Sequence, residues 1–299
     1  MSNTERECGI RGVLQTEDGH EIVWRRFEPE ELGDAEGVVV IAAAMGVTQS
    51  FYRAFAHWLS TQNFVAVTFD YLGMGESLSG PLSAVPGDVI RWAAQDASAV
   101  LGEVLRRYPD LPVTWVGHSQ AGQTVPFIQQ HERFSTLIFV TAGSGYWKKT
   151  APNIRRFGPL LWRVVVPLSL RLFGYFPGAR LGVVGNLPHG VMSQWRAWCL
   201  HPDYLIGVQG AAVRPLYDAV TTPTFVLSTA DDELMSYDGI AALNAFYPNS
   251  PQDWLHLEPQ SYGLDVVGHM GVFRRSNQVL WPQVLLPALA RRAPNGVSA

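Results

Sequence analysis

The chain has few cysteines and few charged residues for its length. Its 299 residues include 2 Cys, and Asp, Glu, Lys and Arg together make up 16%. Cys8 and Cys199 lie so far apart in sequence that we expect ordinary thiols of a reducing compartment, with a disulfide possible but unsupported. The formal net charge is −4, and there is no stripe or tail rich in Lys and Arg. This charge distribution argues against nucleic acid as the partner.

Long hydrophobic runs are also scarce. The first ten residues contain three charged side chains and no apolar core of a secretory signal, so we expect a cytoplasmic protein. The most apolar stretch, residues 159–176, is interrupted by Arg163, Pro167 and Arg171. It therefore predicts amphipathic helices and no transmembrane segment, with association at a membrane surface as a less favoured alternative. No group of His, Cys or Asp has the spacing of metal ligands, and we expect neither a metal nor a cofactor.

The residues that are present predict a large α/β domain. Hydrophobic residues make up 47% of the chain, which is enough for a sizeable core. Short apolar runs predict strands over residues 21–27, 38–42, 65–69, 113–116, 137–140, 224–228 and 254–257. Helical patterns between them cover residues 50–61, 89–108 (with Asp88 as the cap), the segment from the serine turn to His131, 237–246 and 280–292. This alternation is typical of a mostly parallel central sheet with flanking helices.

The alternation breaks once. Residues 146–220 show no clear strand and are rich in proline, glycine and aromatic residues. We therefore predict a core formed by residues 1–145 and 221–299, with residues 146–220 inserted as a mostly helical cap. In open α/β sheets ligands bind beyond the carboxyl ends of the strands, so the cap is expected to lie over that edge.

The motif that carries most chemistry is Gly117-His118-Ser119-Gln120-Ala121-Gly122, which follows an apolar run. A strand, a Gly-x-Ser turn and a helix in this order place a serine hydroxyl on a sharp turn above a parallel sheet. The turn is crowded, so the neighbours of the serine must be small. The strict pattern has glycine two residues after the serine, and here that residue is alanine. Ser119 is the predicted nucleophile.

A serine nucleophile needs a histidine as general base and a carboxylate that orients the histidine. The carboxylate is expected in the loop after the strand at residues 224–228, where Asp231, Asp232 and Glu233 are adjacent. Spacing from the strand end favours Asp232, and Asp231 remains the alternative. Capping of the following helix would explain one of these aspartates without a catalytic role.

Two histidines follow these acids. His256 alternates with apolar neighbours and is expected to point outward from a strand. His269 lies between glycines in Val-Gly-His-Met-Gly, a loop before the last helix, and is the predicted base. His118 directly precedes the serine and is expected to support the turn structurally.

The tetrahedral intermediate of acyl transfer carries an oxyanion, which needs about two backbone N–H donors. We expect one from Gln120, the residue after the nucleophile. The second is expected from Met45 in the segment 43–46, which follows the first buried strand. An ordinary tight turn with a core methionine is the alternative for that segment.

Taken together, these motifs resemble the α/β-hydrolase superfamily over residues 38–292. The loop Phe69-Asp70-Tyr71-Leu72-Gly73-Met74-Gly75-Glu76-Ser77 is similar to the Asp-x-Arg-Gly-x-Gly-x-Ser loop of that superfamily, with leucine in place of arginine. The segments Gly-His-Ser-x-x-Gly-Gln, Gln194-Trp195-Arg196-x-Trp198-Cys199 and Gly268-His269-x-Gly271 look similar to bacterial predicted hydrolases of esterase or lipase type. The resemblance implies a cofactor-independent Ser-His-Asp hydrolase with Ser119, Asp232 and His269. The usual His-Gly before the oxyanion loop is replaced by Ala43-Ala44.

The sequence therefore predicts a serine esterase that acts on a carboxylic ester, thioester or lactone through an acyl-enzyme. An acyltransferase with the same residues and a non-catalytic binder of hydrophobic ligands are the alternatives. The aromatic cap favours a small-molecule substrate with an apolar portion. Trp147, Trp195 and Trp198 are the predicted pocket residues, although the last two are almost equally expected as anchors of the cap. The sequence gives no indication of the oligomeric state.

Overall fold

The computed structural model describes residues 7–290. The expected signal-free N-terminus and the end of the last helix at residue 292 fall partly outside these residues. Within them, an eight-stranded sheet has the order β1-β2-β4-β3-β5-β6-β9-β10. In this sheet order, every pair from β4–β3 to β9–β10 is parallel. The pairs β1–β2 and β2–β4 are antiparallel. The mostly parallel sheet predicted from the sequence is therefore confirmed.

The strands follow the expected apolar runs closely. Their bounds are β1 Ile10–Gln15, β2 Glu21–Phe27, β3 Gly37–Ala42, β4 Phe64–Phe69, β5 Val113–His118, β6 Phe134–Val140, β9 Thr224–Thr229 and β10 Gln252–Leu257. Every residue of β3, β4, β5 and β9 is buried, as expected for parallel strands covered by helices on both faces. The strand β1 was missed by sequence reasoning. The Asp18-Gly19 pair that follows it was the available sequence signal, and the strand shows alternating exposure in the structure.

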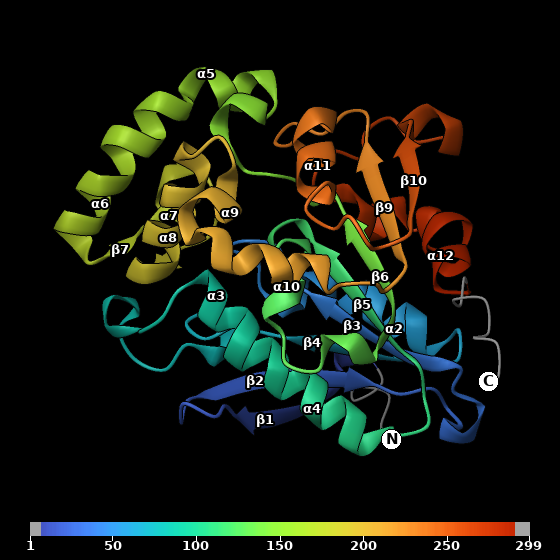
Figure 1. The fold of residues 1–299 in the computed structure, drawn as a ribbon. Helices are drawn as coiled ribbons and strands as arrows, with labels where there is room; N and C mark the ends of the chain where they lie inside the picture. The colour runs from blue at the N-terminus through green and yellow to red at the C-terminus, as the bar shows by residue number, and fades with distance from the viewer. Residues whose placement is uncertain (1–6, 291–299) are drawn as a thin grey trace.

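Helices cover the two faces of the sheet (Figure 1). Outside the insertion they are α2 Arg53–Ser60, α3 Val89–Arg91, α4 Ser98–Arg107, α11 Tyr237–Asn244 and α12 Leu286–Ala290. A π-helical turn, Trp92–Ala97, joins α3 to α4, and another, Trp281–Leu285, precedes α12. The Asp88 side chain accepts a hydrogen bond from the Arg91 N–H at 2.9 Å, which confirms the expected cap.

The prediction of a helix between the serine turn and His131 is wrong. The chain instead forms three separate 3-10 turns, Ser119–Gly122, Val125–Phe127 and His131–Arg133. Pro126 explains the difference, because it lacks an N–H and disfavours helical geometry in the residue before it. The Gln123 carbonyl also accepts a hydrogen bond from the Tyr217 hydroxyl, which holds the chain away from a continuous helix.

The segment between β6 and β9 is mostly helical. Its elements are α5 Pro152–Leu160, α6 Val166–Phe173, β7 Tyr175–Phe176, α7 Gly178–Leu181, β8 Leu187–Pro188, α8 His189–Leu200, α9 Tyr204–Gln209 and α10 Arg214–Asp218. A π-helical turn, Leu161–Val165, joins α5 and α6 into one long helix. The expectation of no strand is corrected by the short antiparallel pair β7 and β8. These elements gather on one side of the sheet, with α5 and α6 outermost (Figure 1).

Candidate active site

The serine turn has the geometry that a nucleophile turn requires. Ser119 follows β5 directly and has φ +53°, a left-handed conformation that is strained for a residue with a side chain. A Cβ on Gly117 would lie 2.8 Å from the Gly122 nitrogen, so only glycine fits there. Ala121 is fully buried, and its carbonyl accepts a hydrogen bond from the Trp115 indole at 3.1 Å. The small residues around Ser119 thus allow the chain to fold back on itself.

The structure separates the two candidate aspartates. The Asp232 carboxylate accepts a hydrogen bond from His269 Nδ1, with Oδ2 at 2.9 Å and Oδ1 at 3.1 Å. The Asp231 carboxylate instead accepts the backbone N–H groups of Val267 and Gly268 at 2.8 and 2.9 Å. The adjacent Glu233 accepts the His269 N–H at 2.9 Å. Three consecutive acids therefore hold one loop, and only Asp232 contacts the imidazole.

Two of these roles were missed by sequence reasoning. Asp231 and Glu233 fix the backbone of residues 267–269, which positions His269 for its contact with Asp232. Gly268 has φ +62°, and a Cβ there would lie 2.5 Å from the Glu233 Oε2 atom. The visible signal in the sequence was that three acids are adjacent. Spacing from the strand end selects one of them as the orienting acid and assigns no role to the other two.

His118 links the serine turn to the histidine loop. It is fully buried, and its Nε2 lies 3.0 Å from the His269 carbonyl oxygen. A carbonyl only accepts, so His118 Nε2 carries the proton and Nδ1 accepts from the Tyr52 hydroxyl at 2.7 Å. The Tyr52 oxygen in turn accepts the Ala44 N–H at 2.9 Å. The chain of hydrogen bonds joins the segment 43–46, the serine turn and the base loop.

This network requires a neutral imidazole at position 118. Burial, together with the nearby His269, lowers the pKa of His118 to about 3. His118 therefore supports the site as a fixed hydrogen-bond donor and acceptor, in agreement with the structural role expected from the sequence. His256 also lies as expected. It is exposed on β10, where its Nδ1 atom and the Ser228 hydroxyl are 2.8 Å apart.

The two backbone N–H groups that the sequence suggested for an oxyanion are unused. Within residues 7–290, neither the Met45 N–H nor the Gln120 N–H donates a hydrogen bond to another residue. The preceding N–H, that of Ala44, is occupied by Tyr52. Gln120 lies in the 3-10 turn Ser119–Gly122 and not at the start of an α-helix as expected. Free donors are therefore present at both of the positions that the sequence suggested for an oxyanion.

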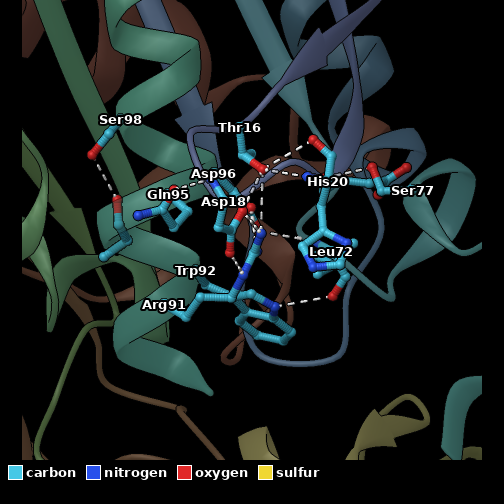
Figure 2. Close-up of polar contacts among 12 residues, drawn as sticks. Thr16, Asp18, His20, Leu72, Ser77, Arg91, Trp92, Gln95, Asp96 and Ser98 are labelled. Carbon is cyan, nitrogen blue, oxygen red and sulfur yellow. Dashed lines mark hydrogen bonds and ion pairs between the residues drawn. The ribbon is translucent and has the colours of Figure 1, made fainter. Parts of the chain in front are cut away.

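The loop after β4 has Leu72 where the related motif has arginine, and it is held by contacts to residues 91–96. In Figure 2 the guanidinium of Arg91 lies between Asp18 and the buried Asp96. Asp96 also accepts the Leu72 N–H at 2.8 Å, and the Trp92 indole donates to the Leu72 carbonyl at 3.0 Å. Burial raises the pKa of Asp96 to about 6. Arg91 and Asp96 thus connect the loop at Leu72 to the segment that joins α3 and α4.

The predicted pocket tryptophans have different surroundings. Trp198 is fully buried against Tyr204, with ring centroids 5.7 Å apart. Trp195 is partly exposed and meets the Trp162 ring edge-on at 5.1 Å. Trp147 is also partly exposed. Within residues 7–290, no cluster of three or more His, Cys, Asp or Glu side chains is arranged to hold a metal ion, and both cysteines are free.

The mostly parallel eight-stranded sheet is that of the α/β-hydrolase fold, and a family model places the chain among hydrolases. The family model described as "Serine aminopeptidase, S33" matches residues 33–182, and the chain belongs to this family. No curated protein matches the chain.

Solved structures with the same fold are distant in sequence. An esterase from Pyrococcus furiosus is 12% identical with a TM-score of 0.61, and the match covers 98% of this chain and 94% of that one. A soluble variant of monoglyceride lipase from Saccharomyces cerevisiae is 17% identical with a TM-score of 0.60, over 91% and 94% of the two chains. A thermostable carboxyl esterase from Bacillus coagulans is 13% identical with a TM-score of 0.56, over 83% and 89%. These likenesses show the fold.

Proposed function

We propose that the protein is a serine hydrolase that cleaves carboxylic esters with an apolar portion. The observation that carries the proposal is the left-handed Ser119 at the end of β5, beside a loop in which His269 is hydrogen-bonded to Asp232. The His118 bond to the His269 carbonyl ties the base loop to the serine turn. Thioesters and lactones present the same reacting carbonyl and belong to the same substrate class.

The chemistry follows the order that these residues allow. The Ser119 hydroxyl attacks the ester carbonyl while His269 Nε2 takes its proton, and Asp232 stabilises the imidazolium. The oxyanion of the tetrahedral intermediate is received by the Met45 and Gln120 N–H groups. The imidazolium then protonates the leaving alcohol, and an acyl-enzyme remains. Water, deprotonated by His269, hydrolyses the acyl-enzyme and returns the serine.

We also propose that residues 146–220 act as a cap that contributes the acyl pocket. Several contacts support this. A Cβ on Gly185 would lie 2.1 Å from the Gly46 carbonyl oxygen, so the insertion approaches the segment that holds Met45. The Tyr204 hydroxyl bonds to the Gln123 side chain at 3.0 Å, four residues after the nucleophile. Trp147, Trp195 and Trp198 are the proposed pocket residues.

An ester substrate fits the insertion better than a peptide with a free amino terminus. An aminopeptidase binds an ammonium group, for which a carboxylate is the natural partner. The chain from residue 133 to residue 202, which includes most of the insertion, contains no Asp or Glu. The small-molecule esters proposed here need only an apolar surface from this segment.

The proposal is tested by labelling with a fluorophosphonate and mass spectrometry of the modified peptide. We expect modification of Ser119, loss of labelling in Ser119→Ala, and turnover of p-nitrophenyl esters above that of aminoacyl anilides. An added alcohol that diverts most of the product from the free acid would assign acyl transfer instead. Absence of labelling with intact folding would leave a ligand-binding protein and contradict the proposal.

A further inference from the structure

The long helix that spans α5 and α6 has an apolar outer face. Within residues 7–290, fifteen large hydrophobic side chains are exposed, and six of them lie between residues 157 and 173. Five of these form a row at steps of three or four residues, each 51–64% exposed, namely Phe157, Leu160, Val164, Leu168 and Leu172. Residues at this spacing share one side of a helix. We call this row the outer stripe.

The opposite face of the same helix is buried against the rest of the insertion. Trp162, Val166 and Leu170 are buried, and Trp162 packs against Trp195 of α8. The outer stripe is therefore not required for the packing of the insertion. A helix that is apolar on both faces normally has both of them covered. A contiguous exposed apolar surface of this kind marks an interaction site.

The charge around the outer stripe indicates what covers it. Residues 146–202 contain no Asp or Glu and eight basic residues, namely Lys148, Lys149, Arg155, Arg156, Arg163, Arg171, Arg180 and Arg196. The whole chain carries −4, so this segment is opposite in sign to the rest of the molecule. Arg155, Arg156, Arg163 and Arg171 are exposed on the helix itself and form no ion pair with any carboxylate of residues 7–290.

We propose that the outer stripe docks the protein on the surface of an anionic lipid bilayer. Leucine and phenylalanine side chains enter the boundary between headgroups and acyl chains, while the flanking arginines bind the lipid phosphates. The helix lies in the plane of the surface and does not cross it. In the described part of the chain no helix is long and apolar enough to cross a membrane.

The position of the helix in the fold agrees with this occupant. Figure 1 shows α5 and α6 along the outer side of the insertion, with α8 and α9 between them and the core, so a flat surface can approach them. The outer stripe ends one residue before Phe173, whose ring lies 6.4 Å from that of Tyr175. Tyr175 lines a groove of about 610 Å³ that extends to Gly46 and Met74 in the core. The end of the docked helix thus adjoins a groove that leads toward the segment containing Met45.

A second copy of the chain is a poorer occupant. A two-fold contact through the outer stripe would place the exposed arginines of both copies in one interface. No acid between residues 133 and 202 is available to compensate them. Lipid phosphates are anionic and do not carry this penalty.

The test measures binding and does not depend on catalysis. The full-length protein is sedimented with vesicles of phosphatidylcholine alone or with phosphatidylglycerol added. We expect at least about tenfold stronger partitioning onto the anionic vesicles, because the arginines beside the outer stripe are attracted to anionic headgroups. The double variant Leu168→Ser with Leu172→Ser, and separately Arg156→Gln with Arg163→Gln, should each lower this partitioning by about tenfold. Raising the salt to about 1 M should weaken the binding of the wild type.

Matched controls come from the opposite edge of the sheet. Leu32 is 48% exposed before β3, and Arg133 is exposed before β6. Leu32→Ser and Arg133→Gln should bind vesicles like the wild type. All variants should keep the melting temperature and the hydrolysis of a soluble short-chain ester, so that a failure of docking is distinguished from a failure of the proposed function.

Three outcomes would overturn the proposal. Equal partitioning of wild type and helix variants would show that the outer stripe is not involved. Equal binding to neutral and anionic vesicles would contradict the role of the arginines. Self-association that depends on Leu168 and Leu172, without any vesicle binding, would assign the face to a second copy.

Discussion

The loop around His269 is held by hydrogen bonds, whereas the insertion is held mostly by apolar contacts. Three carboxylates, two hydroxyls and a buried imidazole form hydrogen bonds with the backbone and side chains of residues 267–269. The insertion has no carboxylate before Asp203, and its outer helix exposes leucines and arginines. The Trp162 and Trp198 indole nitrogens are buried without a hydrogen-bond partner in the described chain. Catalytic groups need fixed distances and angles, whereas the binding of apolar molecules depends more on the contact area than on the direction of each contact.

The largest effect is expected from removal of the nucleophile. Ser119→Ala should fold and lose nearly all ester hydrolysis, by a factor on the order of 10⁶, as in serine proteases that lose the serine. Turnover of a p-nitrophenyl ester and the melting temperature are the measurements. Near wild-type turnover would remove Ser119 from the proposed mechanism.

The three acids that follow β9 have two different expected roles, since one orients the His269 imidazole and two hold the backbone around it. Asp232→Asn should lower kcat by about 10⁴, because the amide favours the wrong tautomer of His269. Asp231→Asn and Glu233→Gln should cost about 10–100-fold, since each weakens only bonds to backbone N–H groups. Rates of all three variants are compared at saturating substrate. A larger loss from Asp231→Asn would move the orienting role to that residue.

The two tryptophans of α8 test the insertion. Trp198→Ala should destabilise the protein by about 3–5 kcal/mol, as expected when a fully buried indole leaves a cavity. Trp195→Ala should cost less stability and change the ratio of kcat/KM for C4 and C10 esters, because its ring is partly exposed. Melting temperatures and the two ester rates are measured together. An unchanged ester ratio for both variants would make them anchors of the insertion alone.

The buried His118 gives the folded state a pH dependence. Its pKa is about 3 in the folded protein and about 6.5 in an unfolded chain. Between these values the unfolded state binds more protons, so stability falls as the pH falls below about 6.5. The loss from pH 7 to pH 5 should be about 2 kcal/mol. Urea unfolding at both pH values measures it.

The control for this prediction is His118→Gln, which removes the titrating ring. Its stability should change less over the same pH interval, even if it is lower at pH 7. A wild-type protein whose stability rises on acidification from pH 7 to pH 5 would contradict the assignment of a neutral His118.

Much of the core was predictable from the sequence because its signals are local. Apolar runs of β3, β4, β5 and β9 located the strands, and Asp88 located the start of α3. The serine turn was visible because its close packing requires small residues at fixed positions. The catalytic roles of Ser119, Asp232 and His269, the cytoplasmic location and the absence of a cofactor stay predictions.

Contacts between distant segments were not predictable in the same way. The sequence by itself determined the order of the parallel core strands, the position of the serine turn and the small set of acids and histidines that follow it. Only the tertiary structure decided that Asp232 meets His269, that Asp231 and Glu233 hold its backbone, and that Arg91 lies on Asp96. Spacing favours one of several neighbouring residues as the orienting acid, but it does not give the partners of the others, because neighbouring side chains leave the backbone in different directions. Which partner each one reaches is therefore fixed only when the loops pack together.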